Sequence, residues 1–288
     1  MFDSNDIKEA VRDRYAGTAT RGDSCCAPAK ESAVPSSCGC GPDGTVVIGG
    51  SIDSAELGYS ADDLAAIPEG ADLGLGCGNP LAVLGLREGE TVLDLGSGAG
   101  IDCFIAAKRV GPTGQVIGVD MTPEMIGRAR RSAASGGYEN VEFRLGEIEH
   151  LPVADDTVDA IISNCVINLA PDKGQVFAEA HRVLRPRGRL SISDIVLLGD
   201  VPVAIRDSID AYVACLSGAI LRDDYLGMLA EAGFADVTVT SERSFDLSDI
   251  IASDLIEEYK KHTGATNDEL VAAAKQFQSI RVSAIKPA

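Results

Sequence analysis

Three of the eight cysteines in this sequence stand beside the expected elements of an α/β core, and one of them lies where ligands commonly bind. Cys165 follows the apolar, β-branched run "VDAIIS" and one asparagine, so it lies where a buried strand gives way to a loop. Cys77 lies in "LGLGCGNP" and Cys215 in "YVACLSGAI". Only the fold can bring these three together, and converging thiols would bind a soft metal or metalloid. Each alone could instead be a packed core residue.

The remaining cysteines fall into two groups. Cys103 lies in "IDCFIAAKRV", where we expect a helix, and packing in the core explains it best. Cys25, Cys26, Cys38 and Cys40 lie in a segment rich in Gly, Ser, Ala and Pro that reads as irregular chain. Their spacing lacks the two-residue separation of zinc knuckles, which disfavours a zinc site.

A glycine loop provides the second chemical signal. In "VLDLGSGAGID", Gly96, Gly98 and Gly100 allow a sharp turn and close approach of the backbone to a ligand. A dinucleotide fingerprint requires a further glycine at position 101, and Ile101 stands there instead, which argues against NAD. Asp120 ends the next expected strand, where a carboxylate can accept both hydroxyls of a ribose.

The elements that position these residues alternate regularly from residue 91. We expect strands at 91–95, 115–120, 141–145, 158–163 and 189–196, and helices at 101–110, 122–134 and 173–184, with Thr122 as an N-cap. This alternation predicts an α/β fold with a doubly wound, mostly parallel, Rossmann-like sheet. Residues 203–233 are predicted to be helical, which puts Cys215 on a helix. Late strands are expected at 235–242 and 279–286, with a helical, cap-like extension between them.

The sequence divides into three expected regions. Residues 1–70 should contain an amphipathic helix at 5–16, with Ile7, Val11 and Tyr15 at spacings of four, and then the flexible cysteine-rich segment. Residues 71–200 should form the ligand-binding core. Residues 201–288 should carry Cys215 and the last strands.

Composition excludes several classes of function. A net charge of −19, from 44 acidic and 25 basic residues, opposes binding to nucleic acid or an anionic membrane. No apolar run approaches the roughly 20 residues of a membrane span, and the first residues lack a signal-peptide apolar region, so we expect a cytoplasmic protein. Thiols stay reduced there, which disfavours a disulfide scaffold. None of His150, His181 and His262 has helical ligand spacing.

The glycine loop and its acidic partners resemble the class I S-adenosylmethionine-dependent methyltransferases. The resemblance places Asp94 near the amino-acid part of the cofactor, Asp120 at the ribose, and "GEIEHLP" after the third strand near the adenine. The cofactor-binding residues that it implies are Asp94, Gly96, Ser97, Gly98, Gly100, Asp120, Met121, Glu147, Ile148 and Asn164.

Between about residues 70 and 235 the sequence resembles the arsenite S-adenosylmethionine methyltransferases more specifically. The motifs "LGCGNP", "DLGSGAGIDC", "GVDMT", "GEIE", "ISNCVINL" and "CLSGA" occur in that order. The resemblance implies that Cys77, Cys165 and Cys215 are the catalytic thiolates that bind trivalent arsenic. Three sulfur ligands leave the arsenic lone pair free to attack a methyl group, so no general base is required.

The implied function is methylation of arsenite and methylarsenite, serving arsenic detoxification, with thioredoxin or glutathione as the thiol reductant. The four N-terminal cysteines would then relay arsenite or reduce a disulfide, or belong to a dispensable solvated segment. One alternative is a methyltransferase of a small organic acceptor with structural cysteines. Another is a non-catalytic metalloid-binding protein, against which the intact Asp94, Gly96, Gly98 and Asp120 argue.

Overall fold

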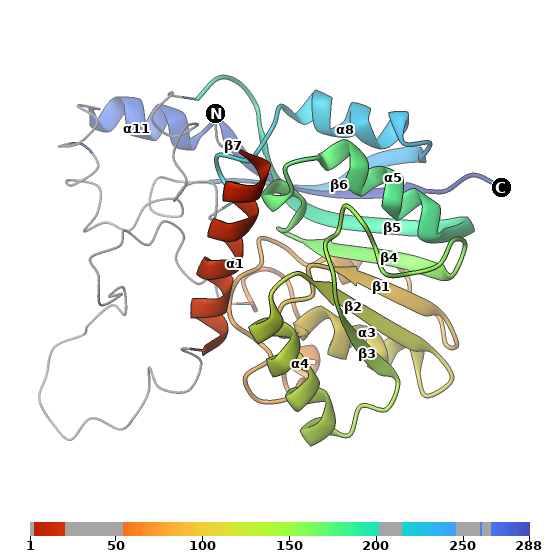
Figure 1. Cartoon of the computed structure of the whole chain (residues 1–288). Coiled ribbons are helices and arrows are strands. Elements are labelled where there is room, and N and C mark those ends of the chain that lie inside the picture. Colours follow the sequence, from red (N-terminus) through yellow and green to blue (C-terminus); the bar gives the residue numbers. More distant parts are fainter. Residues whose placement is uncertain (1–2, 21–53, 202–214, 246–259, 261–265) are drawn as a thin grey trace, which may run out of the picture.

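The computed structural model describes residues 3–20, 54–201, 215–245, 260 and 266–288 (Figure 1). Over these residues the strands form a seven-stranded sheet in the order β3-β2-β1-β4-β5-β7-β6. Its parallel part consists of β1 (Thr91–Leu95), β2 (Gln115–Asp120), β3 (Val141–Leu145), β4 (Val158–Asn164) and β5 (Leu184–Leu197). Strand β7 (Phe277–Ile285) pairs antiparallel with β5 and with β6 (Ala235–Ser244). The expected doubly wound, mostly parallel sheet is confirmed.

Helices cover both faces of the sheet because the central strands are apolar on both sides. Val92 faces a core cluster built with α3 (Ile101–Val110) and α4 (Pro123–Gly136). Leu93, the next residue, faces the opposite cluster with α5 (Lys173–Val183) and α8 (Arg222–Glu231). Strand β1 is therefore packed on both faces, and this packing fixes the position of the glycine loop that follows it.

Shorter elements and the late helix complete the described structure. They are α2 (Ala61–Leu64), the 3₁₀ turns η1 (Pro80–Ala82) and η2 (Ile167–Leu169), and α11 (Asn267–Ala274). No described helix is long and apolar enough to cross a bilayer.

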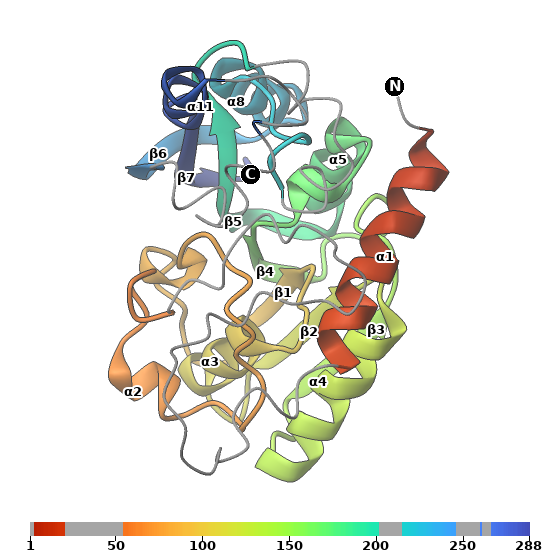
Figure 2. The same ribbon diagram turned by 90° about the vertical axis from the view of Figure 1, so that its left-hand side faces the viewer.

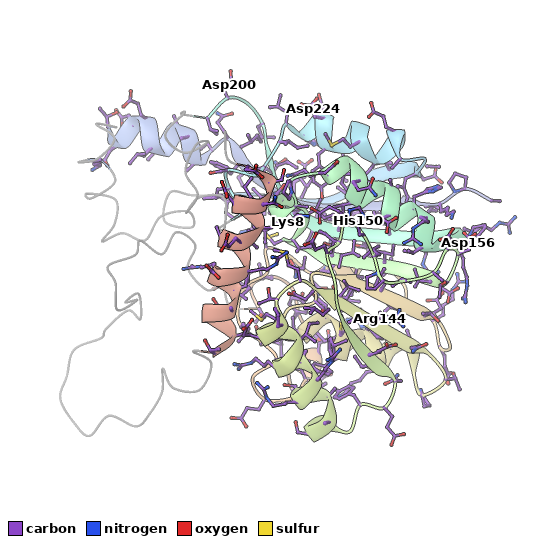
Figure 3. All side chains as sticks on the ribbon, in the orientation of Figure 1. Lys8, Arg144, His150, Asp156, Asp200 and Asp224 are labelled. Carbon is purple, nitrogen blue, oxygen red and sulfur yellow. The ribbon has the colours of Figure 1, made fainter. Side chains whose placement is uncertain are left out.

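The N-terminal helix α1 (Ser4–Thr20) lies against the body of the protein beside α4 and η2, as two views at right angles show (Figures 1 and 2). Ile7 and Val11 are buried, as their spacing predicts. Figure 3 shows Lys8 where α1 meets the body, whereas Asp156, Asp200 and Asp224 project from the periphery. Helix α1 is therefore part of the folded unit.

The prediction that Cys215 lies on a helix is wrong. Cys215 has a left-handed φ of +64° and stands in a turn, and α8 begins only at Arg222. The backbone N–H of Leu197, at the end of β5, donates to the Ile220 carbonyl. The chain just before α8 is therefore bonded to the end of β5. Apolar composition alone did not distinguish a packed turn from a buried helix.

Candidate functional site

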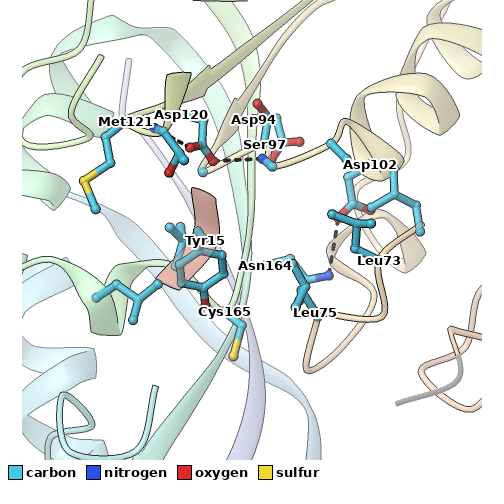
Figure 4. Close-up of a pocket in the computed structure, with 18 of the residues that line it drawn as sticks. Tyr15, Leu73, Leu75, Asp94, Ser97, Asp102, Asp120, Met121, Asn164 and Cys165 are labelled. Carbon is cyan, nitrogen blue, oxygen red and sulfur yellow. Dashed lines mark hydrogen bonds between the residues drawn. The ribbon is translucent and has the colours of Figure 1, made fainter. Parts of the chain in front are cut away.

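A pocket opens at the carboxyl ends of β1, β2 and β4, the edge at which open α/β sheets bind ligands. Its walls come from the glycine loop, the end of β2, residues 71–76, the loop after β4, and α1. Figure 4 shows Asp120 and Ser97 along one side, Asn164 and Cys165 along the other, and Tyr15 between them. The pocket therefore joins the glycine loop to one of the three conspicuous thiols.

The glycine loop begins at a residue that leaves no room for a side chain. Gly96 has a φ of +68°, and a Cβ there would lie 2.2 Å from the Val166 side chain. The loop then brings the Gly98 N–H to 2.9 Å from Oδ2 of Asp120, while the Thr122 N–H lies 2.8 Å from Oδ1. Each carboxylate oxygen of Asp120 retains a lone pair, so it can also accept a hydroxyl from a bound ligand.

Two further carboxylates, Asp94 and Asp102, line the pocket with almost no exposure to solvent. The Cys103 thiol donates to Oδ2 of Asp94 at 3.2 Å. Burial, and then the neighbouring Asp102, raise the pKa of Asp94 well above its usual range. Burial also raises the pKa of Asp102 to about 6. With Asp120, the pocket thus presents three carboxylates and suits a cationic ligand.

Asn164 links the acidic side of the pocket to the Cys77 loop. Its Nδ2 donates to the Gly78 carbonyl at 2.8 Å, to the Tyr59 hydroxyl at 3.0 Å and to Oδ2 of Asp102 at 3.3 Å. Its Oδ1 accepts the Cys77 N–H at 3.1 Å. The amide is therefore occupied in holding the loop that carries Cys77.

The fold brings Cys77, Cys165 and Cys215 into one buried cluster. The Cys215 thiol donates to the Cys165 carbonyl at 2.9 Å. Hydrogen bonds with the thiols of Cys215 and Cys77, and then burial, raise the pKa of Cys165 well above its usual range. Burial likewise raises the pKa of Cys77. Cys77 and Cys165 are therefore neighbouring thiols that favour the neutral form.

Backbone geometry marks two of these cysteines as special. Cys165 and Cys215 have φ values of +59° and +64°, a region that residues with a side chain seldom occupy. Strain of this kind persists only where surrounding structure enforces it, and it concentrates at functional sites. Within the described ranges, no three His, Cys, Asp or Glu side chains are already arranged around a metal position.

A buried polar network supports the turn that carries Cys215. Asn168 Nδ2 donates to Oδ1 of Asp194 at 2.9 Å, to the Ile195 carbonyl at 2.6 Å and to the Cys215 carbonyl at 3.5 Å. Burial raises the pKa of Asp194 to about 6, and Lys173 Nζ donates to the Asn168 carbonyl at 3.4 Å. These contacts hold the thiol cluster against β5.

Helix α1 closes one side of the pocket through charge and apolar contact. Lys8 lies 2.7 Å from Glu147 and 3.0 Å from Glu149, and Arg12 lies 2.6 Å from Glu147. The Tyr15 ring packs against both the thiol cluster and the glycine-loop side. Burial, and then the nearby Cys215 and Cys165, raise the pKa of Tyr15 well above its usual range.

Comparison with known proteins agrees with this geometry. Residues 86–233, more than half of the chain, match the family model of a methyltransferase domain. A crystal structure of an arsenic(III) S-adenosylmethionine methyltransferase from Chlamydomonas reinhardtii matches with a TM-score of 0.59 and 31% identity, covering 82% of this chain and 73% of that one. The chain belongs to the arsenite methyltransferase family.

Two curated arsenite methyltransferases are similar to this family member in sequence. The one from Halobacterium salinarum is 54% identical over 237 residues, which are 82% of this chain and 59% of that protein. The one from Aquipseudomonas alcaligenes is 40% identical over 181 residues, which are 60% of this chain and 52% of that protein. The chain thus covers little more than half the length of these relatives.

In this arsenite methyltransferase family member, most of the expected cofactor residues line the pocket. They are Asp94, Gly96, Ser97, Gly98, Asp120, Met121, Ile148 and Asn164. Gly100 does not: its φ is +98°, it caps α3, and a Cβ there would lie 2.8 Å from Phe143. Glu147 is not a lining residue either, because its carboxylate is turned to Lys8 and Arg12 of α1.

Sequence reasoning did not find Asp102, Tyr59 or Tyr15 as site residues. An acidic residue in the first turn of the helix that follows a glycine loop is a signal for Asp102, because carboxylates favour helix N-termini. Tyr59 and Tyr15 carry no such local signal. Cys103 is buried in the core, as expected. Cys25, Cys26, Cys38 and Cys40 lie outside the described residues.

Proposed function

We propose that this protein transfers methyl groups from S-adenosylmethionine to trivalent arsenic bound by Cys77, Cys165 and Cys215. The observation that carries the proposal is the position of Cys165, which lines the acidic pocket and also belongs to the buried thiol cluster. An arsenic atom on this thiol would face the pocket in which the methyl donor binds. Arsenite and methylarsenite are the proposed substrates, because the similar proteins from Halobacterium salinarum and Aquipseudomonas alcaligenes are arsenite methyltransferases.

The residues of the pocket fit S-adenosylmethionine, which when bound supplies a methyl group on a positively charged sulfur. Asp120 would accept the two ribose hydroxyls with the lone pairs left by Gly98 and Thr122. Asp94 and Asp102 would face the ammonium group, and Ile148 would pack against the adenine. The tight turn at Gly96 lets the glycine loop pack directly against Val166 in the wall of the pocket.

The state of the thiols favours arsenous acid over a divalent cation. Raised pKa values of Cys77 and Cys165 keep both protonated in the free protein. A zinc ion requires thiolates, and their burial without compensation is unfavourable. Arsenous acid is neutral and exchanges each hydroxyl for a thiol with loss of water, so no net charge is buried. The arsenic lone pair would then need only to be placed in line with the methyl group. Tyr15 and α1, which line this junction, would help to exclude water from it.

The same chemistry supports a thiol reductant as co-substrate. Donation of the lone pair to a methyl cation takes arsenic formally from the trivalent to the pentavalent state. Two electrons, supplied by a dithiol such as thioredoxin or by two molecules of glutathione, return it to the trivalent state with formation of a disulfide. We also propose that the protein acts in the cytoplasm, where such thiols are reduced, and that it serves arsenic detoxification.

Mass spectrometry of the products from arsenite, S-adenosylmethionine and glutathione tests the proposal. We expect mono- and further methylated arsenic species, with S-adenosylhomocysteine formed one for one with each methyl group transferred. Cofactor binding in equilibrium dialysis without any arsenic product would instead favour a small organic acceptor. Absence of cofactor binding would favour a non-catalytic metalloid-binding protein.

The buried carboxylates predict a pH dependence of cofactor binding. Burial raises the pKa of Asp102 from 3.8 to about 6, so it is protonated in the free protein below that pH. A cationic cofactor favours the ionised form, so its affinity should rise from about pH 5 to about pH 7 and binding should release protons. Calorimetry in two buffers of different ionisation enthalpy measures both effects.

Asp102→Asn is the matched variant for this titration, since it removes the ionisable group and keeps the side-chain shape. Its affinity should be lower and should change less with pH. An equally steep pH profile in Asp102→Asn would assign the titration to another group. Asp94, whose pKa burial also raises, is then the group to replace.

Cys25, Cys26, Cys38 and Cys40 are proposed to deliver arsenite or to recycle a disulfide. Replacing all four with serine should slow turnover at low arsenite concentration and leave a single turnover of pre-loaded enzyme intact. Rapid-quench measurement of one methyl transfer by pre-loaded enzyme, compared with the steady-state rate at low arsenite, distinguishes delivery of arsenite from the methyl transfer itself. Stoichiometric zinc in the purified parent protein, together with unfolding of the four-serine variant, would contradict this assignment.

A further inference from the structure

A second cavity, of about 130 Å³, lies next to Cys77 and is distinct from the cofactor pocket. Its walls are the loop 77–79 and side chains from three neighbouring strands, β5, β6 and β7. Cys77 lines this cavity and does not line the cofactor pocket. One of the three thiols is therefore approached from a side that the donor does not use.

Two serines, one on β5 and one on β7, line the cavity. Ser193 is 1% exposed, and its Oγ has no hydrogen-bond partner among the described residues. Gly78 lies over it so closely that a Cβ there would come within 2.7 Å of that oxygen. Ser279 Oγ donates to the Cys77 carbonyl at 2.9 Å and also contacts the Cys77 thiol. The cavity thus holds an unused buried donor and adjoins the Cys77 sulfur.

Two arginines line the cavity in a protein that is strongly acidic. Arg243 and Arg281 line it, and Glu56, the single carboxylate among its described lining residues, is exposed. Arg281 donates through Nη1 to the Asn79 carbonyl and through Nε to the Thr240 hydroxyl, both at 3.1 Å. These acceptors are neutral, and among the described residues no carboxylate forms an ion pair with Arg281. A guanidinium beside a hydroxyl donor is the usual recognition of a carboxylate.

Building on the proposed function, we propose that this cavity binds the carboxylate of a small thiol and so places its sulfur at Cys77. A cavity of this size admits a carboxylate and the few atoms next to it, which favours a small molecule such as glutathione over a protein reductant. When the thiol carries arsenic, its As–S bond breaks, an As–S bond to Cys77 forms, and the Cys77 proton passes to the departing thiolate. When it is free, it enters as the reductant.

The decisive test uses two alkylating agents that differ only in charge. Iodoacetate carries a carboxylate and iodoacetamide a neutral amide, and both alkylate a thiol by displacing iodide. We expect the ratio of their rates at Cys77, measured by peptide mass spectrometry, to fall at least about fivefold in Arg281→Gln, and to be partly restored in Arg281→Lys. The ratio at Cys165 in the same samples should not change.

Arg185→Gln is the matched control, because Arg185 is an exposed arginine paired with Asp159 and does not line the cavity. It should leave the ratio at Cys77 unaltered. An unchanged ratio in folded Arg281→Gln would overturn the proposal. Alkylation does not depend on methyl transfer, so this failure is distinguishable from failure of the proposed function.

Two further arms separate the sources of the thiol. If the cavity receives arsenic, Arg281→Gln should slow loading from the arsenic–glutathione complex and spare loading from the complex with uncharged 2-mercaptoethanol. If it receives the reductant, the variant should slow steady-state turnover with glutathione and spare turnover with dithiothreitol. Equal rates of parent and variant in every arm would contradict both.

Discussion

Replacing Cys165 with serine is expected to reduce methylation of arsenite and of methylarsenite by at least about 100-fold. Cys165 is the thiol that lines the cofactor pocket, and its neighbours Cys77 and Cys215 lie behind it in the same cluster. Arsenite has three exchangeable oxygens and can take all three thiols. Methylarsenite keeps one arsenic–carbon bond and can take only two, so one cysteine becomes dispensable for it.

Cys77 is the expected dispensable thiol, because it belongs to the loop before β1, whereas the Cys215 thiol donates to the carbonyl of Cys165, the thiol that lines the pocket. Cys77→Ser should lose activity on arsenite and keep much of its activity on methylarsenite, whereas Cys215→Ser should lose both. Product analysis by liquid chromatography with arsenic detection measures these rates. Cys103→Ser is the control for removal of a buried sulfur, because Cys103 lies outside the thiol cluster. This variant should bind as much arsenite per protein molecule as the parent does. Near-parent methylation of methylarsenite by Cys165→Ser would refute the arrangement.

Replacing Asp120 with alanine is expected to weaken binding of S-adenosylmethionine by at least roughly 100-fold. Each charge-assisted hydrogen bond lost costs about 1.5–3 kcal/mol, and the ribose would form two of them. The Gly98 and Thr122 N–H groups also lose their acceptor, so the loop beneath the cofactor loosens in the same direction. Arsenite binding to the thiols should change little, since Asp120 does not belong to their cluster.

Calorimetric titration of cofactor and of arsenite into the same preparation checks both expectations. Asp155→Asn is the matched control, because this aspartate pairs with Arg182 on the surface and does not line the pocket. Its cofactor affinity should equal that of the parent. Unaltered cofactor affinity in Asp120→Ala would remove Asp120 from the site.

The local sequence pattern was enough to predict most of the fold. The strands at 91–95 and 115–120 were predicted with the boundaries observed, because short apolar runs bounded by glycine and polar residues have few other readings. The glycine loop and Asp120 followed from the same pattern. Where the pattern was only apolar, as around Cys215, it did not separate a helix from a packed turn, and the turn was missed.

The parts of the site that escaped prediction depend on pairing between distant segments. Asn164 bonds to Tyr59, Gly78 and Asp102, and none of these lies near it in sequence. Glu147, which the family resemblance places near the adenine, forms ion pairs with Lys8 and Arg12 of α1, and its motif after the third strand does not indicate these contacts. Such contacts depend on how distant segments pack together, and the local sequence around one residue does not reveal this.

The hydrogen bond from Ser279 to the Cys77 carbonyl joins residues 202 positions apart, and this has a consequence for biosynthesis. At about 5–20 residues per second, β7 leaves the ribosome roughly 10–40 s after the Cys77 loop. Strand β7 lies between β5 and β6, so β6 has no partner in the sheet until β7 arrives. A nascent chain that has already folded its parallel strands therefore still lacks a finished thiol cluster. A chain truncated before Phe277 should bind the methyl donor and fail to hold arsenic, so capture of the metalloid depends on the arrival of β7.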